Sequence, residues 1–595
     1  MNRYARLVNW TSLLVVAVFV ALVFAQASKR FVLDEVDFPV LAKAIMETGL
    51  PYHYRGESDP ASIGLWHPPL YAYALALFVK IFGFSEGSVR AFGMFCTLAT
   101  AGLCVAIHRQ LFPVAKASTR WFVPIFLLLF LLHPYTIANS TVPDIDTTVM
   151  PVTMLAFILV LLEKFCFGPA QARTRIPYGD VLFLAAFFAL NLWVKMTTPI
   201  ALIPLAFVLL ALSRRWSLAA SAAISALVAL AGTAAFVLTY GLYCLVAGLP
   251  FGFVFGFLAH SFTKNNSSGG GLSALMDGVL DHLTYGQQFV NWVGLPFLAA
   301  IFFSCGVLLF NFRRALAETI LLVLAGFALF ISIFYLGLTG AFGSFFKYPF
   351  ATFGLLTLVV AHCLAQWLPL DEPPAQPANG GAMDRLAGSL RGKLPWALAA
   401  VAAVLAAGWQ VFRLGDVAIF QDRPVSLTIL GQILAAALVA SALLNWRPGR
   451  VIGRYLVVAL LAVVGATSFV VSRIQAKAAY PTKYHYGQTG FDETVSYLHE
   501  HAAPGEPIWA MKDIGHYATG RYYENYMALW KPGPEVSAIL DGLIRDQGVR
   551  YFVVTRGVGQ DRVDVYGGLK EGLDHCCHVE KTFGNFVIYR ANSDE

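Results

Sequence analysis

Long apolar runs separated by short polar stretches dominate the chain from residue 10 to residue 472. A helix needs about 20 mostly apolar residues to cross a bilayer, and about thirteen runs approach that length. They lie at 10–26, 87–108, 121–138, 146–166, 180–194, 197–212, 217–243, 290–311, 316–337, 346–367, 395–413, 425–446 and 452–472. This pattern predicts an α-helical polytopic membrane protein. The first run is not followed by a small-residue cleavage site and a soluble domain. We therefore interpret it as a retained span and not as a signal peptide that is removed.

Basic residues gather in alternate loops between these runs, at 109–120, 164–175, 214–215, 313–314, 385–393 and 447–454. If the N-terminus is cytoplasmic, every one of these loops is cytoplasmic too, as the positive-inside rule requires. The arrangement needs the run 66–83, which contains Lys80, to lie at the outer interface instead of crossing. An odd number of crossings then places the chain after Arg473 outside.

Composition supports a membrane protein and excludes other classes. The 595 residues are 58% hydrophobic and 13% charged, whereas soluble domains are about 25% charged. The net charge is only +7, and no basic patch is interleaved with aromatic residues, so nucleic acid is not an expected partner. The eight cysteines include an adjacent pair, Cys576 and Cys577, that could bridge only with strain. With no CxxC spacing, neither a disulfide framework nor a zinc site is supported.

The composition changes sharply after residue 474. Helical patterns at 490–502 and 535–547 alternate with predicted strands at 507–511, 550–555 and 585–590. Such alternation predicts a small α/β domain. It contains neither a GxGxxG motif nor a Walker loop. The predicted organisation is a transmembrane module at 1–366, a Pro/Gly/Ala-rich cytoplasmic linker at 367–394, further spans at 395–473 and the α/β domain at 474–595.

Three outer regions gather polar residues: the loops 27–86, 139–146 and 248–289. The first contains an acidic cluster, Asp34, Glu35 and Asp37. Acidic side chains this close to a membrane are costly unless they face water or a cavity, which indicates a functional site. The alternative is that they solvate the N-terminus of a helix, where acids are favoured. The third loop holds a Ser/Gly-rich run suited to a lid.

Several short motifs follow one another in a fixed order. They are Asp34-Glu35, His67-Pro68-Pro69-Leu70-Tyr71, Arg90, Asp144 or Asp146, Lys195, and Lys347-Tyr348-Pro349. This order resembles the GT-C membrane glycosyltransferases, nearest the branch of the protein O-mannosyltransferases and lipid A aminoarabinose transferases. The resemblance covers 1–366 well and the remainder more loosely. The order and common sidedness of the motifs carry it, since no single motif is specific.

The resemblance implies an enzyme of the inner (cytoplasmic) membrane with a periplasmic C-terminal domain. It implies sugar transfer from a polyprenyl-phosphate donor to a hydroxyl acceptor on a lipid, glycan or protein at the outer face, with inversion. Asp34 matches the catalytic aspartate and is expected to act as general base, since a carboxylate must take the acceptor's proton. Glu35 beside it is expected to orient the acceptor or a positive partner. No metal and no cofactor are expected.

The same resemblance assigns substrate contacts to His67 and Tyr71 of the outer loop. His67 stands where relatives often carry lysine, and it could contact phosphate only when protonated. The alternative is that it caps the helix at the interface. Asp144 and Asp146 could position the substrate or basic partners. Alternatively, they cap the helix that begins near Thr147.

Lys195 and Lys347 each lie near the outer end of an apolar run. A lone lysine there can extend its ammonium group to the interface, but two that converge on one acidic loop would form a phosphate clamp. Tyr348 belongs to the same expected substrate site. Arg90 is a third candidate cation, with a structural role as its alternative.

Two other function classes remain open. A polytopic transporter or lipid flippase would show internal repeats and charges in the middle of spans, and neither is clear. An O-antigen ligase or polymerase would favour long outer loops with paired arginines, of which this chain offers few.

Overall fold

The structure is a computed structural model of the chain. It describes residues 3–31, 35–52, 67–113, 121–167, 176–253, 255–256, 293–310, 315–332, 347–367, 489–503, 505–524, 534–555 and 563–592. The predicted spans at 395–413, 425–446 and 452–472, and the predicted base Asp34, lie outside these residues. The chain divides into two compact units, which are residues 1–27 with 90–476 and residues 28–89 with 477–595.

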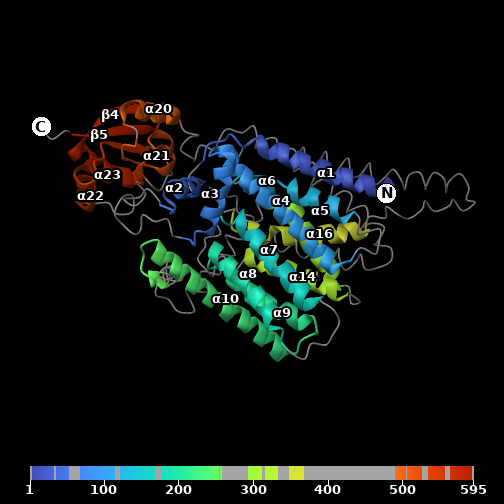
Figure 1. Cartoon of the computed structure of the whole chain (residues 1–595). Coiled ribbons are helices and arrows are strands. Elements are labelled where there is room, and N and C mark those ends of the chain that lie inside the picture. Colours follow the sequence, from blue (N-terminus) through green and yellow to red (C-terminus); the bar gives the residue numbers. More distant parts are fainter. Residues whose placement is uncertain are drawn as a thin grey trace, which may run out of the picture. The chain divides into compact units, whose positions relative to one another are not determined.

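The first unit is helical (Figure 1). Its helices are α1 (Arg3–Phe24), α4 (Glu86–Leu111), α5 (Phe122–Leu131), α6 (Pro134–Ser140), α7 (Val149–Leu161), α8 (Tyr178–Val194), α9 (Leu202–Leu212), α10 (Leu218–Val246), α13 (Leu295–Phe310), α14 (Leu316–Phe330) and α16 (Phe350–Trp367). Every predicted span before residue 368 overlaps one or more of them. Among the described residues, four helices are long and apolar enough to cross a membrane, or five if the bent pair α5–α6 is one span. The count of thirteen spans stays a prediction.

One predicted span is interrupted by a bend, and the predicted boundary between the runs 180–194 and 197–212 falls at the end of a helix. The run 121–138 is bent by 65° between α5 and α6. Pro134 begins α6, and the backbone N–H of Tyr135 donates to Nδ1 of His133 at 3.1 Å. A proline ring cannot continue the preceding helix, which explains the bend. α8 ends at Lys195, whose backbone is extended with φ −158° and ψ 136°.

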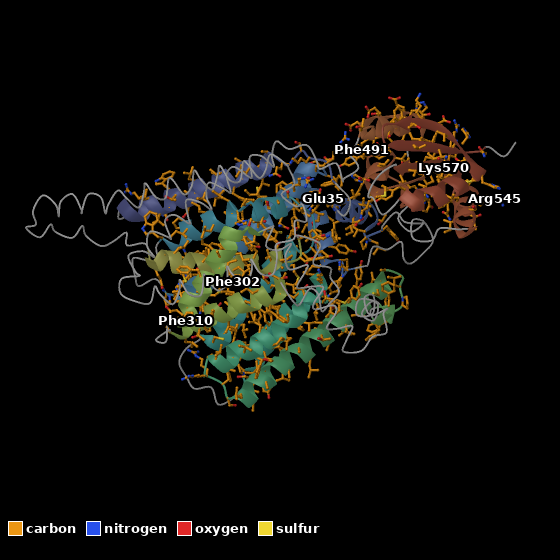
Figure 2. The ribbon with its side chains drawn as sticks, turned by 180° about the vertical axis from the view of Figure 1, so that it is seen from behind. Glu35, Phe302, Phe310, Phe491, Arg545 and Lys570 are labelled. Carbon is orange, nitrogen blue, oxygen red and sulfur yellow. The ribbon has the colours of Figure 1, made fainter. Side chains whose placement is uncertain are left out.

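Helix α16 is buried at every position from Phe350 to Ala365, as expected for a helix that is apolar all round. On α5, the rings of Phe122, Phe126 and Phe130 stack in sequence, with centroids 5.7 Å and 5.5 Å apart. Phe130 then meets Phe353 of α16 at 6.1 Å. On α13, Phe302 and Phe310 are half-buried (Figure 2). Aromatic packing therefore joins α5 to α16.

In the second unit, α2 (Asp37–Thr48) and α3 (Leu70–Phe82) pack against each other. The rings of Phe38 and Tyr71 meet edge to face at 4.7 Å, and the hydroxyl of Tyr73 donates to the carbonyl of Gly49 at 2.8 Å. Gly49 ends α2 with φ 83°, a conformation that glycine adopts without steric cost. At 1.5 Å per residue, α3 is roughly 20 Å long, less than the ~30 Å of a hydrocarbon core.

The remainder of this unit contains a five-stranded sheet (Figure 1). In chain order its elements are α20 (Phe491–His501), β1 (Ile508–Ala510), α21 (Lys512–Ala518), β2 (Tyr522–Glu524), α22 (Pro534–Arg545), β3 (Tyr551–Thr555), α23 (Val563–Cys576), β4 (Cys577–Phe583) and β5 (Phe586–Ala591). The strand order is β2-β1-β3-β5-β4. β1 runs parallel to β2 and β3, whereas β5 runs antiparallel to β3 and β4.

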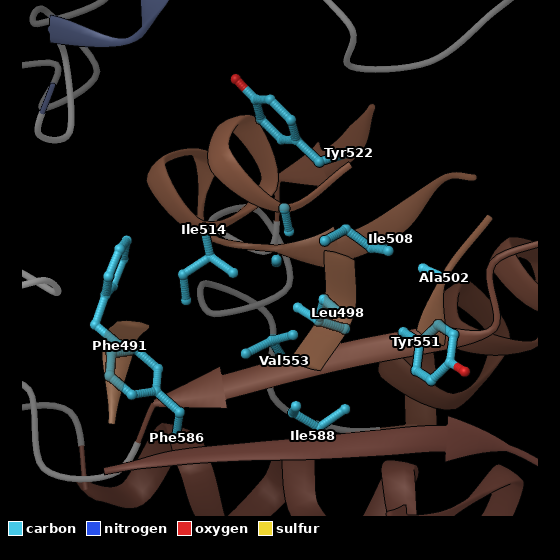
Figure 3. Close-up of a cluster of buried hydrophobic side chains, with 12 residues drawn as sticks. Phe491, Leu498, Ala502, Ile508, Ile514, Tyr522, Tyr551, Val553, Phe586 and Ile588 are labelled. Carbon is cyan, nitrogen blue, oxygen red and sulfur yellow. The ribbon is translucent and has the colours of Figure 1, made fainter. Parts of the chain in front are cut away.

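Alternate residues of the central strands serve two cores, because successive side chains of a strand point to opposite faces. One core joins Ile508, Val553 and Ile588 to side chains of α20 and α21 (Figure 3). The other contains Trp509 and Phe552 with apolar side chains of α22 and α23. Helices therefore cover both faces of the sheet, and charged residues such as Arg545 on α22 and Lys570 on α23 are exposed (Figure 2).

His516 of α21 makes the stability of this unit depend on pH. Burial, and then the charge of Lys43, lower the pKa of His516 to about 4, although Glu86 and Asp513 oppose the shift. The folded chain therefore keeps this ring neutral at pH values where the unfolded chain, with a pKa of 6.5, takes up a proton. The free energy of unfolding should fall, by up to about 3 kcal/mol, as the pH drops from 6.5 to 4.

The check is thermal unfolding of the intact protein in detergent at pH 7.5 and at pH 5. Because glutamine does not titrate, His516→Gln should lose less in Tm over this interval than the wild-type chain. Parallel losses in both proteins would assign the acid sensitivity to other groups.

Candidate active site

The loop between α6 and α7 holds two buried aspartates in a fixed conformation. Oδ1 of Asp144 accepts the backbone N–H of Asp146 at 3.0 Å. The hydroxyls of Thr147 and Thr148 donate to the carbonyl oxygen of Asp144 at 3.1 Å and 2.5 Å. Asp144 and Asp146 are 5% and 2% exposed. The N-cap residue of α7 is Thr148, so neither aspartate occupies the capping position.

Two lysines from distant parts of the chain neutralise these carboxylates. Nζ of Lys195, at the end of α8, donates to both carboxylate oxygens of Asp146 at 2.9 Å and 2.8 Å. Nζ of Lys347, just before α16, donates to Oδ2 of Asp144 at 2.7 Å. Both lysines are buried, and their ammonium groups end in ion pairs inside the protein. Charge-assisted hydrogen bonds of this kind are stronger than neutral ones.

The ring of Tyr348 adjoins both ammonium groups. Its centroid is 4.3 Å from Nζ of Lys195 and 5.6 Å from Nζ of Lys347. A cation over an aromatic face within about 6 Å is attracted by the ring, more strongly where water is excluded. Tyr348 therefore links the two ion pairs into one cluster, which we call the buried charge cluster: Asp144, Asp146, Lys195, Lys347 and Tyr348.

Arg90 of α4 holds the start of the same loop. It is buried, and its Nη1 donates to the carbonyl oxygen of Thr141. One turn further along α4, a Cβ on Gly93 would lie only 2.4 Å from the carbonyl oxygen of Ser140. Glycine at that position lets α4 approach the end of α6 closely, which brings Arg90 within reach of the loop.

The charges of the buried charge cluster itself cancel, since Lys195 and Lys347 contribute two positive charges and Asp144 and Asp146 contribute two negative charges. The buried guanidinium of Arg90 lies beside the same loop. Buried charges act on a charged ligand more strongly than the same charges in water would. Within the part of the chain that the structure describes, no group of three His, Cys, Asp or Glu side chains could hold a metal ion.

The other predicted site residues lie in the second unit. Glu35 and His67 are half-buried, and Tyr71 is buried in the contact between α2 and α3. Asp37 is the first residue of α2, where an acid is favoured. Its Oδ2 also accepts from Nζ of Lys512 at 2.9 Å, and both side chains are buried. Sequence reasoning missed Lys512, because nothing in the sequence connects residues 475 positions apart.

Comparisons with known proteins agree with the predicted resemblance. Residues 66–239 match the family model described as dolichyl-phosphate-mannose-protein mannosyltransferase. No curated protein matches the chain. A solved structure of ArnT from Cupriavidus metallidurans bound to undecaprenyl phosphate is 15% identical, covers 98% of each chain and has a TM-score of 0.52. The structure of the same protein in the apo state is also 15% identical, covers 97% of each chain and has a TM-score of 0.51.

A solved structure of the Archaeoglobus fulgidus oligosaccharyltransferase is 13% identical. It covers 98% of this chain and 75% of its own, with a TM-score of 0.48. The family match covers the segment from His67 through α4, the aspartate loop and Lys195. The buried charge cluster therefore lies largely inside the matched region, with Lys347 and Tyr348 beyond it.

Proposed function

We propose that this chain, which resembles the GT-C membrane glycosyltransferases in sequence and fold, transfers a sugar from a polyprenyl-phosphate carrier to a hydroxyl acceptor at the outer face of the inner membrane. The observation that carries the proposal is the buried charge cluster, in which two lysines from distant parts of the chain converge on one aspartate loop. The similar ArnT structure is described as bound to undecaprenyl phosphate, which is a lipid anion of the class proposed for the donor.

The proposed reaction is a single inverting displacement. The acceptor oxygen forms a bond to the anomeric carbon while the bond from that carbon to the phosphate oxygen breaks. Asp34 takes the hydroxyl proton, a role that typically contributes 10²–10⁴-fold, and Glu35 orients the acceptor. The polyprenyl phosphate leaves with one more negative charge than it had as an ester, so fixed cations lower the barrier.

Within the cluster we assign different roles to the two lysines. Lys195 places two hydrogen bonds on Asp146 and its charge over Tyr348, so its positive charge is well compensated. Its proposed role is to hold the cluster together. Lys347 is the more exposed of the two, with 10% of its side chain accessible against 4%. We therefore assign Lys347, supported by Arg90, to the departing phosphate.

Lys347→Met should weaken use of the donor, whereas Lys347→Arg should be tolerated, since charge is the main requirement. We expect the donor KM to rise about tenfold in Lys347→Met, because one hydrogen bond to a charged group contributes roughly 1.5–3 kcal/mol. Steady-state transfer in detergent at varied donor concentration gives this value.

The matched control is Lys347→Met/Asp144→Asn, which leaves no unpaired carboxylate. The double variant should regain the Tm that Lys347→Met loses and yet keep the raised donor KM. A donor KM equal to that of the wild type in both variants would leave Lys347 with a structural role.

The proposed function is tested by comparing envelope glycans of cells with and without the protein by mass spectrometry. One sugar modification should disappear, and purified protein with a polyprenyl-phosphate sugar should restore it on an extracted acceptor. Unchanged glycans, together with movement of labelled lipid-linked sugar across vesicles that contain the protein, would favour the flippase alternative.

We further propose that the basic loops face the cytoplasm and that residues 474–595 face the exterior. Cysteine placed at Ser118 or at Lys570, in a background without the native cysteines, reports the side of each segment. A membrane-impermeant thiol reagent added to cells with a permeabilised outer membrane should label Lys570→Cys and spare Ser118→Cys. The reverse pattern would contradict this topology.

A further inference from the structure

Helix α21 of the α/β domain contacts the stretch that carries the acidic cluster. The hydroxyl of Tyr517 accepts the backbone N–H of Phe31 at 2.7 Å. The ring of His516 lies 6.2 Å from that of Phe31. One turn earlier, Lys512 pairs with Asp37. A single short helix therefore binds the chain on both sides of Asp34 and Glu35.

The pair between Lys512 and Asp37 is the most demanding of these contacts. Nζ and Oδ2 are 2.9 Å apart, and the two side chains are only 8% and 12% exposed. Burying either charge without its partner would cost several kcal/mol. The pair is therefore favourable only when the two side chains meet in good geometry. Because only Met511 separates Lys512 from the end of β1, the sheet sets the place of this lysine.

Neighbouring contacts hold the same stretch at other points. Arg30 pairs with Asp492, and its guanidinium lies 5.5 Å from the centroid of the Tyr517 ring. The hydroxyl of Tyr517 also donates to Oε1 of Glu86 at 3.3 Å. Tyr517 thus joins the beginning of the stretch 28–89 to its end.

We propose that α21 positions the acidic stretch for catalysis and that Lys512 is a positioning residue for the start of α2, the helix that begins three residues after Asp34 in the sequence. This inference rests on the proposed function. Phe31 and Asp37 are six residues apart, and six residues reach at most roughly 20 Å. One helix therefore binds both ends of this short stretch. Such precision matters because a misplacement of about 1 Å can cost 10²-fold in rate.

The test uses a pair of variants that separates positioning from folding. Lys512→Met/Asp37→Asn removes both charges, so no unpaired charge stays buried, while Lys512→Arg keeps the charge. In the double variant kcat should fall roughly 10²-fold with the donor KM unchanged. In Lys512→Arg kcat should stay within a few-fold of the wild type. Lys570→Met, an exposed lysine of the same domain, is the control and should leave both constants unchanged.

A second readout does not depend on the reaction. Hydrogen exchange followed by mass spectrometry should show faster exchange at 35–48 in the double variant, with residues 202–212 of the first unit unchanged. If the wild-type protein transfers no sugar, the proposed function fails. Unchanged exchange at 35–48 in the double variant would in addition show that Lys512 and Asp37 do not hold this stretch in place.

Two results would overturn the positioning role when transfer is observed. One is faster exchange at 35–48 with a wild-type kcat, which would make the contact purely structural. The other is an equal loss in kcat and in donor affinity together with faster exchange in both units, which would indicate general destabilisation.

Discussion

Asp34→Asn is expected to lower the rate of sugar transfer by about 10² or more, which corresponds to roughly 3 kcal/mol of transition-state stabilisation. Asparagine keeps the size and most of the hydrogen bonds of aspartate but cannot accept the acceptor's proton. The loss should therefore fall on the chemical step and spare donor binding. Single-turnover transfer in detergent, with the donor bound beforehand, isolates that step.

Glu35→Gln is the matched control, because it makes the same change one residue away. It should cost less than Asp34→Asn, since an orienting carboxylate shares its task with other contacts. The Tm should barely change in either variant. Near wild-type transfer by Asp34→Asn, with Glu35→Gln or Asp144→Asn inactive, would show that the base is misassigned.

The helices of the first unit were predictable because apolar length is a strong signal. The bend between α5 and α6 was not predicted, since the run 121–138 is apolar on both sides of Pro134. Lys195 was recognised because a lone charge between two short apolar runs is unusual. The extended backbone of Lys195 was not predicted, because a single extended residue after a helix produces no periodic pattern in the sequence.

In the sheet, the sequence indicated the three inner strands and missed the two outer ones. β1, β3 and β5 are buried on both faces and rich in apolar residues. β2 has only three residues. β4 exposes Val579 and contains the charged residues Glu580 and Lys581. Short and polar edge strands are what folded sheets use to avoid pairing with other chains. The same property makes them hard to recognise in a sequence.

The candidate site was predictable as a set of residues and not as a set of contacts. The two lysines and the two aspartates stood out because charges are rare in apolar surroundings. Which lysine pairs with which aspartate depends on contacts across 49 and 203 positions of the chain. Only the packing of α4, α8 and α16 around the aspartate loop decides that pairing.

Lys195→Met is expected to lower the free energy of unfolding by about 3–5 kcal/mol, because it leaves Asp146 buried without its counterion. Asp146 and Lys195 have only 3% and 4% of their side chains exposed, so little water can replace the lost bonds. Chemical unfolding of the purified protein in detergent, compared with the wild type at one pH, measures this loss.

Lys195→Met/Asp146→Leu removes both charges and is expected to recover most of that stability, since an apolar pair of similar volume avoids the cost of desolvating two ions. If the ion pair serves only folding, the double variant should also transfer sugar at the wild-type rate. We expect a different result, in which stability returns and transfer does not, because the ring of Tyr348 then loses one of the two ammonium groups that hold it beside Lys347. A single variant as stable as the wild type would contradict the assignment of Lys195 as the residue that holds the buried charge cluster together.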